Sequence, residues 1–544
     1  MAHDARSASR PAARIRDECW AVWQLARAGG LRPMPVRGVG RVVRAMRDYG
    51  PIGAAVSMAA IRHGDRVALI DDRGPLTFAE VDARSNAVAN AWRSRGLRGG
   101  DGVGILARNH RGFLDALFAA AKSGARIVLL NTDFGEVQLA DVVRREGVDL
   151  LVHDAEHADA VAGLDVRLGG VMTWSDSPEG SALETLIASG DPSPPPRPGA
   201  EPKLVILTSG TTGTPKGAPR SEPRSLMPAG ALLSKAPFRA RGVTECCVPL
   251  FHALGFGHLM LALLFGSTLV VRRRFDPRDT LDSLSRHRAT AMIAVPIMLR
   301  RIIDLGPQAR AGHDLAALNI IFVAGSQLGA GLCREAMTVF GPVIYNMYGS
   351  TEVAYATIAT PEDLAAEPNC VGQVVPGTVV KLFDERGREV PVGAPGRIFV
   401  ANGIQFDGYT GGGAKESIGG LISSGDIGHF DGAGRLFIDG RADDMIVSGG
   451  ENVFPAEVEE ALANHPDILE AAVIGIPDGE YGQRLRSFIA LRPGASLTED
   501  DVKDYVRQRL ARFKIPRDVR FVEALPRNST GKVVRRLLDT AHEA

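Results

Sequence analysis

The sequence predicts an α/β protein, with a large N-terminal domain of βα-wound sheets, a small β-barrel-like subdomain within it, and a small α+β domain at the C-terminal end. From about residue 67, short apolar runs alternate with stretches of helical length, which is typical of parallel sheets covered by helices. After residue 370, glycine and aspartate separate shorter strands, as in an antiparallel barrel. Beyond residue 450, helix and strand patterns alternate again on a smaller scale.

These patterns give three expected segments: a basic extension at 1–50, a large domain at 51–440 and a small domain at 441–544. In the large domain we expect strands at 67–70, 102–106, 127–130, 150–153, 204–207, 267–271, 291–295 and 319–323, and helices at 78–95 and 112–122. The barrel-like part is expected to hold strands at 379–383, 396–401 and 436–438. The small domain is expected to contain helices at 453–464 and 499–510 and strands at 468–476 and 485–491.

The composition excludes several classes of protein. Equal numbers of basic and acidic residues, 63 of each, give no overall field toward nucleic acid. Five cysteines without a CxxC spacing argue against a disulfide framework or a zinc site and fit a reducing cytoplasm. No apolar run has the length of a membrane span or the pattern of a signal peptide. We therefore expect a cytoplasmic protein.

The segment 1–50 is unusual, because it holds ten arginines against four acids, with apolar residues between them (Trp20, Trp23, Leu25, Val42 and Met46). Two interpretations are open. The segment could form a basic helix that lies on lipid, giving peripheral membrane contact. The simpler interpretation, which we favour at this stage, is a solvated extension that packs loosely on the body.

Residues 204–217 join an apolar strand to a loop of glycines, hydroxyls and one lysine. Hydroxyl residues occupy five of the seven positions from 208 to 214, and the glycines let the backbone approach an anion. The loop therefore predicts a phosphate site rather than a plain surface turn. Its lysine is followed by Gly217 and Ala218, so it is not the P-loop of nucleoside triphosphatases. The residues of this candidate site are Thr208, Ser209, Gly210, Thr211, Thr212, Gly213, Thr214 and Lys216.

Four further residues stand out. Glu352 follows a strand and a glycine turn and could hold Mg²⁺, or could cap a helix. Asp426 could bind the two hydroxyls of a ribose, or form an Asx turn, and Arg441 could contact phosphate or ribose, or be an exposed turn charge. Lys532 is one of only nine lysines against 54 arginines, which suggests a compact cation that reaches into a site.

With the segment 249–255, these motifs resemble, in order and spacing, the adenylate-forming superfamily of acyl-CoA synthetases, luciferases and nonribosomal adenylation domains. The resemblance runs from about residue 50 to the C-terminal end and favours the acyl-CoA synthetase, or fatty-acid–CoA ligase, branch. It implies ATP, Mg²⁺ and coenzyme A as cofactors and co-substrates. The implied reaction joins a carboxylic acid to AMP with release of pyrophosphate, and then transfers the acyl group to CoA with release of AMP.

The resemblance also implies residue roles. The loop from Thr208 to Lys216 would hold the β- and γ-phosphates, Thr211 and Glu352 would orient Mg²⁺, and Lys532 would bridge the carboxylate and the α-phosphate. Tyr348 would stack on adenine, Asp426 and Arg441 would hold the ribose, and His252 would gate the acyl pocket. The small domain would be mobile, rotating about Asp443 between the two steps. The remaining implied contacts with nucleotide or CoA are Ala324, Gly325, Ser326, Gly349, Ser350, Thr351, Gly449 and Gly450.

The substrate is the least constrained part. The apolar stretch 251–271 favours a medium- or long-chain fatty acid over an amino acid. The alternatives are an enzyme that loads a carrier protein instead of CoA, and a lipid- or nucleotide-binding protein without catalysis. The segment 526–532 also resembles sites of reversible lysine acetylation, so an acetyltransferase acting on Lys532 is a further expected partner. The chain departs from the family after Lys216, at 218–223, and at Ser424, where Thr is common.

Overall fold

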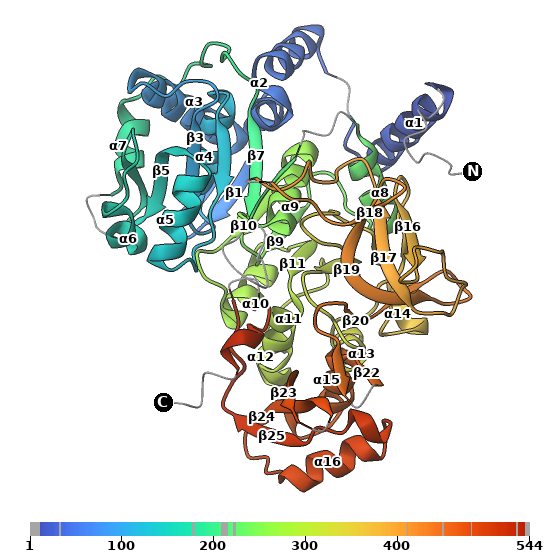
Figure 1. Cartoon of the computed structure of the whole chain (residues 1–544). Helices are drawn as coiled ribbons and strands as arrows, with labels where there is room; N and C mark the ends of the chain where they lie inside the picture. The colour runs from blue at the N-terminus through green and yellow to red at the C-terminus, as the bar shows by residue number, and fades with distance from the viewer. Residues whose placement is uncertain are drawn as a thin grey trace.

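The structure is a computed structural model that describes residues 11–31, 34–176, 180–207, 216–220, 225–410, 412–448, 451–479, 481–528 and 531–538. Two large sheets form the upper body, an antiparallel sheet lies beside them, and a separate small unit lies at the lower end (Figure 1). The predicted fold class is confirmed.

The largest sheet has nine strands in the order β15-β14-β13-β12-β11-β9-β10-β1-β2. Its central strands, from β13 to β1, are parallel, and the outer strands β14, β15 and β2 pair antiparallel. Parallel strands end at one shared edge, which is where ligands bind in open α/β sheets. The strands are β1 (Val67–Asp71), β2 (Gly74–Thr77), β9 (Val243–Cys246), β10 (Thr268–Val271), β11 (Ala291–Ala294), β12 (Ile320–Val323), β13 (Ile344–Tyr348), β14 (Thr357–Ala359) and β15 (Gln373–Val374).

The second sheet has six strands in the order β6-β5-β3-β4-β7-β8, all parallel except β8, which returns antiparallel to β7. The strands are β3 (Gly102–Leu106), β4 (Arg126–Leu129), β5 (Val148–Asp154), β6 (Gly170–Trp174), β7 (Lys203–Leu207) and β8 (Gly217–Arg220). The candidate phosphate loop therefore connects β7 to β8.

One hydrophobic core joins both sheets through buried side chains of the helices α2, α3, α4 and α9. Local signals set the helix ends: α3 begins with a capping box in which Thr77 and Glu80 satisfy each other's backbone amides. The helices of this body are α3 (Phe78–Ser94), α4 (Arg111–Lys122), α5 (Glu136–Arg145), α6 (Ala158–Ala162), α7 (Ala182–Ser189), α8 (Met227–Lys235), α9 (Ala253–Phe265), α10 (Pro277–Arg286), α11 (Pro296–Ile303), α12 (Gly306–Arg310), α13 (Ala330–Phe340) and α14 (Pro361–Ala366), with a 3₁₀ turn η1 (Ala155–His157).

The expected barrel-like part is a five-stranded antiparallel sheet with its own apolar cluster. Its long strand β19 pairs with three neighbours, which carries Asp426 from the sheet toward the end of β13. The strands are β16 (Val379–Phe383), β17 (Gly396–Ala401), β18 (Ser417–Ile418), β19 (Leu421–Phe430) and β20 (Leu436–Arg441).

The C-terminal unit has a separate core and a five-stranded sheet in which β21, β22, β23 and β24 pair antiparallel and β25 pairs parallel with β24. β21 ends at Ser448 and β22 begins at Glu451, on either side of Gly449 and Gly450, which lie outside the described residues. The elements are β21 (Ile446–Ser448), β22 (Glu451–Val453), α15 (Pro455–Ala463), β23 (Ile468–Asp478), β24 (Gly482–Leu491), α16 (Glu499–Arg507), η2 (Arg512–Lys514), β25 (Asp518–Val522) and η3 (Arg535–Leu537).

The N-terminal segment forms α1 (Pro11–Arg27) and the first half of α2 (Val36–His63), which bends at Gly50, where φ is 67°, before Pro51. α1 packs on α8, with Ala21 and Leu25 buried and Gly230 allowing close approach to Ala21. The expectation of a loosely packed extension is therefore wrong for α1. α2 runs through residue 50. The boundaries at 50 and 440 stay predictions. Among the residues that the structure describes, no helix is both long and apolar enough to cross a membrane.

Candidate active site

The carboxyl ends of β12 and β13 form the floor of the candidate active site. Residues 324–326 follow β12, and Tyr348 ends β13 before residues 349–351, so these two predicted segments lie at one edge of the nine-stranded sheet. Gly349 is required here, because a Cβ would collide with the carbonyl oxygen of Ala354. The main chain can therefore fold back closely beneath the site.

Asp426 is the centre of a polar cluster at this edge. The Tyr348 hydroxyl donates to Asp426 Oδ2 at 2.5 Å, and Arg441, its register partner on β20, donates from Nη1 to Oδ1 at 3.3 Å. Burial raises the pKa of Asp426, while the hydrogen bond from Tyr348 and the charges of Arg441 and Lys532 act to lower it. Since its oxygens bind partners on other strands, the carboxylate faces the site and the Asx-turn alternative is wrong.

Glu352 lies in a turn after β13. Its carboxylate accepts hydrogen bonds from the Ser350 hydroxyl at 2.9 Å and from the Tyr409 hydroxyl at 2.7 Å. The Ser350 hydroxyl in turn accepts from the backbone N–H groups of Glu352 and Val353. Residues 349–356 are turn and coil, followed by β14, so the alternative of a helix cap is wrong.

Tyr409 links Glu352 to the lysine of the candidate phosphate loop. The Lys216 ammonium lies 5.2 Å from the centre of the Tyr409 ring, at a distance suited to a cation–π contact. Directly after Lys216, Gly217 begins β8 at a point where a Cβ would collide with Thr410. The Lys216 ammonium and the Glu352 carboxylate, from distant parts of the chain, therefore both contact Tyr409.

Lys532 is presented by a tight turn of the C-terminal unit. Its backbone N–H donates to Asn528 Oδ1 at 3.0 Å, and its carbonyl accepts from the Asn528 N–H at 3.0 Å. Gly531, with φ of 75°, packs so closely on Ile297 at the start of α11 that a Cβ would stand 2.6 Å from it. The lysine turn is thus docked on the large sheet.

The environment of Lys532 is that of an open cleft. Its side chain remains accessible to solvent, yet protein atoms surround it on most sides. Desolvation by these protein atoms and the charge of Arg441 lower the pKa of Lys532, whereas the charges of Asp426 and Glu352 act to raise it. The ammonium therefore interacts with both predicted carboxylates, and the structure brings all three together.

His252 also lies close enough to Lys532 to be affected by its charge. Burial and that charge lower the pKa of His252 to about 3, so the ring is neutral near neutral pH. Its Nε2 atom is buried and has no hydrogen-bond partner among the described residues. A neutral, half-buried ring with a buried Nε2 fits a wall of an acyl pocket better than a proton donor.

Some predicted residues cannot be placed. Thr208 to Thr214, Gly449 and Gly450 lie outside the described residues. The predicted hinge, Asp443, is exposed and lies 3.7 Å from Arg441, just before β21. Its position between the two units agrees with a hinge, and its role stays a prediction.

The described residues also fit the implied Mg²⁺. Within the described part of the chain there is no group of three or more His, Cys, Asp or Glu side chains that could hold a metal by itself. Mg²⁺ needs only one or two protein carboxylates when phosphate oxygens and water complete its shell. Glu352, fixed by Ser350 and Tyr409, provides one such carboxylate.

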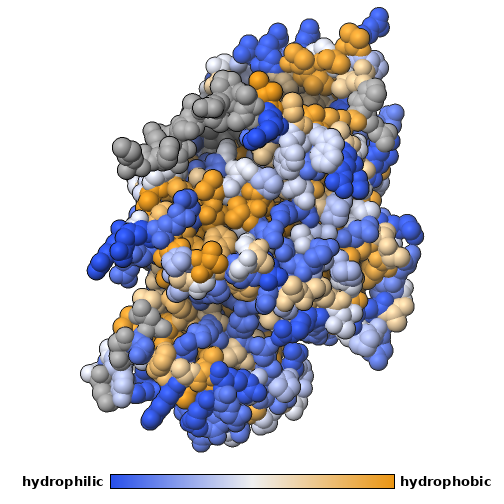
Figure 2. All heavy atoms as spheres, turned by 90° about the vertical axis from the view of Figure 1, so that its right-hand side faces the viewer, coloured by the Kyte–Doolittle hydropathy of each residue, from blue (hydrophilic) through white to orange (hydrophobic). Residues whose placement is uncertain are grey.

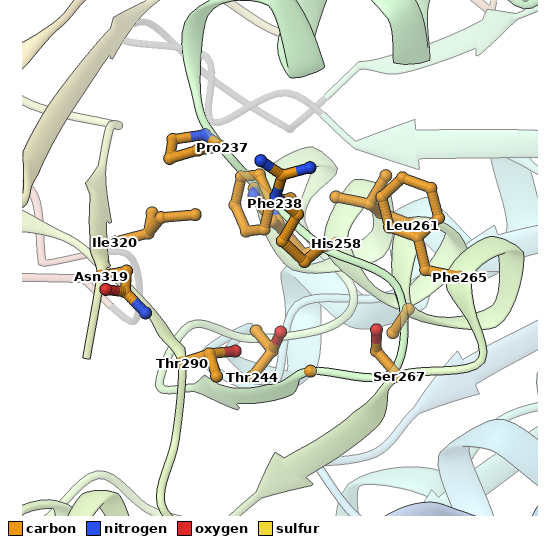
Figure 3. Close-up of a pocket in the computed structure, with 13 residues that line it drawn as sticks. Pro237, Phe238, Thr244, His258, Leu261, Phe265, Ser267, Thr290, Asn319 and Ile320 are labelled. Carbon is orange, nitrogen blue, oxygen red and sulfur yellow. The ribbon is translucent and has the colours of Figure 1, made fainter. Parts of the chain in front are cut away.

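A cavity lies at the other end of the same strands (Figure 3). It is lined by Phe238, His258, Leu261, Phe265 and the strand starts at Thr244 and Thr290, together with the polar residues Arg239, Ser267 and Asn319. His258 donates from Nδ1 to the Leu254 carbonyl, and burial lowers its pKa to about 4. The wall of the cavity therefore combines aromatic and aliphatic side chains with polar ones and holds a neutral histidine.

Sequence reasoning missed Tyr409 and Thr410. Thr410 donates to Glu146 Oε1 at 2.6 Å and lies against Gly217, which fixes the strand after Lys216. The nearest signal in the sequence is the glycine turn before Tyr409, and it gives no indication of a partner 57 positions away.

Comparison with known proteins agrees with this geometry. Residues 56–410 match the family model described as AMP-binding enzyme, and residues 457–532 match the AMP-binding enzyme C-terminal domain. A feruloyl-CoA synthase from Amycolatopsis sp. is 32% identical over 88% of this chain and 94% of that protein. The fatty acid–[acyl-carrier-protein] ligase ScoC from Streptomyces coeruleorubidus is 30% identical over 87% of this chain and 92% of that protein.

Among solved structures, the o-succinylbenzoate CoA synthetase of Bacillus subtilis, in complex with its acyl-adenylate intermediate, superposes with a TM-score of 0.78. It is 25% identical, and the match covers 90% of this chain and 98% of that one. The cofactors implied by the sequence motifs, ATP, Mg²⁺ and CoA, are those of this family. The chain belongs to the AMP-binding enzyme family and is an AMP-forming acid–CoA ligase of the adenylate-forming superfamily.

Proposed function

We propose that this ligase activates an apolar carboxylic acid, with a medium- or long-chain fatty acid as the expected substrate, and that Lys532, Asp426 and Glu352 support the first step. The observation that carries the proposal is the convergence of the Lys532 ammonium with both carboxylates. A protein without catalytic activity gains nothing from charged groups held in a cleft, since removing each of them from water costs free energy. Catalysis is therefore favoured over a lipid- or nucleotide-binding protein without activity.

In the proposed first step, the acid's carboxylate attacks the α-phosphate of ATP and pyrophosphate leaves. Lys532 would hold the carboxylate and the α-phosphate together and stabilise the negative charge that develops between them. Binding these anions would stabilise the protonated amine of Lys532. It would therefore oppose the desolvation that lowers the pKa of this lysine.

The remaining groups would hold the nucleotide. Asp426 and Arg441 would bind the ribose hydroxyls, and Tyr348, whose own hydroxyl is fixed by Asp426, would present its ring to adenine. Lys216 would neutralise charge on the leaving pyrophosphate. Mg²⁺, bound beside Glu352, would supply further neutralisation of phosphate charge when present.

An apolar acid is supported by the walls near Lys532. His252 is neutral, and α9, which follows it, is apolar around most of its circumference. The charged groups that reach the site come from the nucleotide side, as Asp426, Arg441 and Glu352 do. The relatives named above act on an aromatic and on a fatty acid by name, so an aryl acid is the competing substrate class.

A carrier protein is the competing acceptor, since one relative is named as a ligase for an acyl carrier protein. We also propose that Lys532 is open to acetylation, because its side chain is accessible to solvent. Acetylation would remove the charge that the first step needs.

The test is release of pyrophosphate with and without CoA, over straight-chain acids from hexanoate to hexadecanoate and over benzoate and ferulate. The proposal expects acid-dependent pyrophosphate release, acyl-CoA and AMP when CoA is present, and the highest kcat/KM for a fatty acid. A clear preference for benzoate or ferulate would overturn the fatty-acid assignment. Release of pyrophosphate without transfer to CoA would instead favour a carrier protein.

A further inference from the structure

The first half of α2 carries an exposed apolar stripe. Val36, Val39, Val43 and Met46 are all exposed, with Val36 at 88% and Val43 at 61% of full accessibility. At about 100° per residue, their spacing places them within an arc of roughly 80° on one side of the helix. We call these four residues the α2 stripe. They form a continuous apolar face rather than scattered side chains.

The neighbouring side of the same helix is basic. Arg37, Arg41, Arg44 and Arg47 are exposed and occupy the arc next to the α2 stripe, at roughly 20° to 140° on the same scale. The opposite side, with Ala45 and Tyr49, is buried against the body. The helix thus has one face fixed to the protein and two faces, apolar and basic, turned to solvent.

α1 shows a similar division. It buries Ala21 and Leu25 against the body and exposes Ile15, Val22 and Trp23. Of the 15 large hydrophobic residues that are exposed in the described chain, eight lie between residues 15 and 46. Orange and blue spheres lie side by side at the upper end of the molecule, where these helices are placed (Figure 2). Exposed apolar surface is concentrated in this one region.

Both helices are anchored. α2 continues beyond the bend at Gly50 into a buried half that contributes Ile52 and Val56 to the main core. The end of α1 is tied to the body by Arg239, which donates to the Arg27 carbonyl at 2.6 Å. A surface held in this way is fixed to the body, so a membrane that binds it would also hold the rest of the enzyme.

We propose that the α2 stripe and its flanking arginines dock on an anionic lipid bilayer. Apolar residues that enter the interface beside arginines that meet anionic head groups form the usual pattern of an interfacial helix. A second copy of this face is a poorer partner, because it would bring two rows of four arginines together. Lipid head groups supply the opposite charge, so charge complementarity selects the membrane.

The end of α1, which precedes the α2 stripe in the sequence, lies beside the cavity described above. Gly30, just after α1, packs against Phe265, and Arg239 binds Arg27; both Phe265 and Arg239 line the cavity at the amino ends of β9 and β11. The end of α1 and this cavity are therefore neighbours. This placement rests on structure alone and holds whether or not the proposed fatty-acid substrate is correct.

The test is co-sedimentation of the full chain with vesicles of phosphatidylcholine, with or without about a third of phosphatidylglycerol. Three variants are compared with wild type: Val36→Ser/Val39→Ser/Val43→Ser/Met46→Ser, Arg37→Glu/Arg41→Glu/Arg44→Glu, and the control Val137→Ser. Val137 is 79% exposed on α5, away from the docking face. Pyrophosphate release with a water-soluble short acid shows that each variant is folded.

Wild type and the control should bind anionic vesicles, and bind neutral ones less. Both sets of substitutions should lower the partition coefficient by at least about tenfold, and raising salt from about 0.1 M to about 0.5 M should weaken wild-type binding. Equal binding by wild type and the stripe variant would overturn the proposal. So would absence of vesicle binding together with a dimer, seen by light scattering, that the stripe variant dissociates.

Discussion

The Tyr409 hydroxyl donates to Glu352 Oε1 at 2.7 Å, although the two residues lie 57 positions apart. The Lys216 ammonium lies 5.2 Å from the centre of the Tyr409 ring. One tyrosine therefore connects the proposed Mg²⁺ ligand with the lysine of the phosphate loop, and it fixes the direction in which the carboxylate points.

Replacing Tyr409 by Phe should keep the ring under Lys216 and remove only the bond to Glu352. We expect the Mg²⁺ concentration needed for half-maximal pyrophosphate release to rise by about tenfold, since outer ligands orient metal-binding groups at about this scale. The KM for the acid should change little. Titration of Mg²⁺ at saturating ATP measures the effect, and an unchanged Mg²⁺ dependence would show that Tyr409 does not position Glu352.

The rate of adenylate formation should fall at alkaline pH, because Lys532 loses its proton there. The lysine must be charged, which holds below its pKa, and this pKa lies below the ordinary value of 10.5. Adenylate formation should therefore fall as pH rises through the lowered pKa. In Lys532→Arg the guanidinium keeps its charge beyond about pH 12, so the limit should move to higher pH whatever the residual rate. The same alkaline limit in both proteins would assign it to another group.

Proline at position 443 should separate the two half-reactions. Asp443 is exposed between the barrel-like sheet and β21, and proline fixes φ at about −65° there. We expect thioester formation from preformed acyl adenylate to slow much more than adenylate formation. Single-turnover rates of each step measure this. An unaffected second step would remove Asp443 as the hinge.

Gly349→Ala should destabilise the protein, because the new Cβ would collide with the Ala354 carbonyl under the site. A loss of about 2–4 kcal/mol in the free energy of unfolding is expected, as for other severe backbone clashes. Gly403→Ala is the matched control, since nothing lies within 4 Å of a Cβ there. Urea unfolding curves compare the two, and similar curves would contradict the close approach at Gly349.

Much of the fold could be predicted, because apolar strands are bounded by glycine and polar turns. The ranges 102–106, 379–383 and 396–401 coincide with β3, β16 and β17. Strand ends differ from the predicted ranges where no local signal marks them: β23 and β24 extend beyond those ranges because they pair with each other over almost their whole length. The packing of α1 was missed because it depends on the close approach of Gly230, which no local pattern reveals.

The charged residues of the site were identifiable as single residues, since each stands at a turn with glycine or hydroxyl neighbours. That these residues belong to one site was implied only by the family resemblance. The pair of Tyr409 and Glu352 depends on how the turn at 406–410 folds against β8, which is a property of tertiary structure. The neutrality of His252 likewise follows from burial beside Lys532, and its sequence neighbours do not indicate it.

Lys532→Ala tests the central claim most directly, with Lys503→Ala, a surface lysine of the same unit paired with Glu499, as the matched control. The account predicts that pyrophosphate release from acid and ATP falls by at least about a hundredfold in Lys532→Ala, while CoA transfer from preformed acyl adenylate stays close to the control. Equal loss of both half-reactions, or wild-type release of pyrophosphate, would contradict the assignment of Lys532 to the reacting carboxylate.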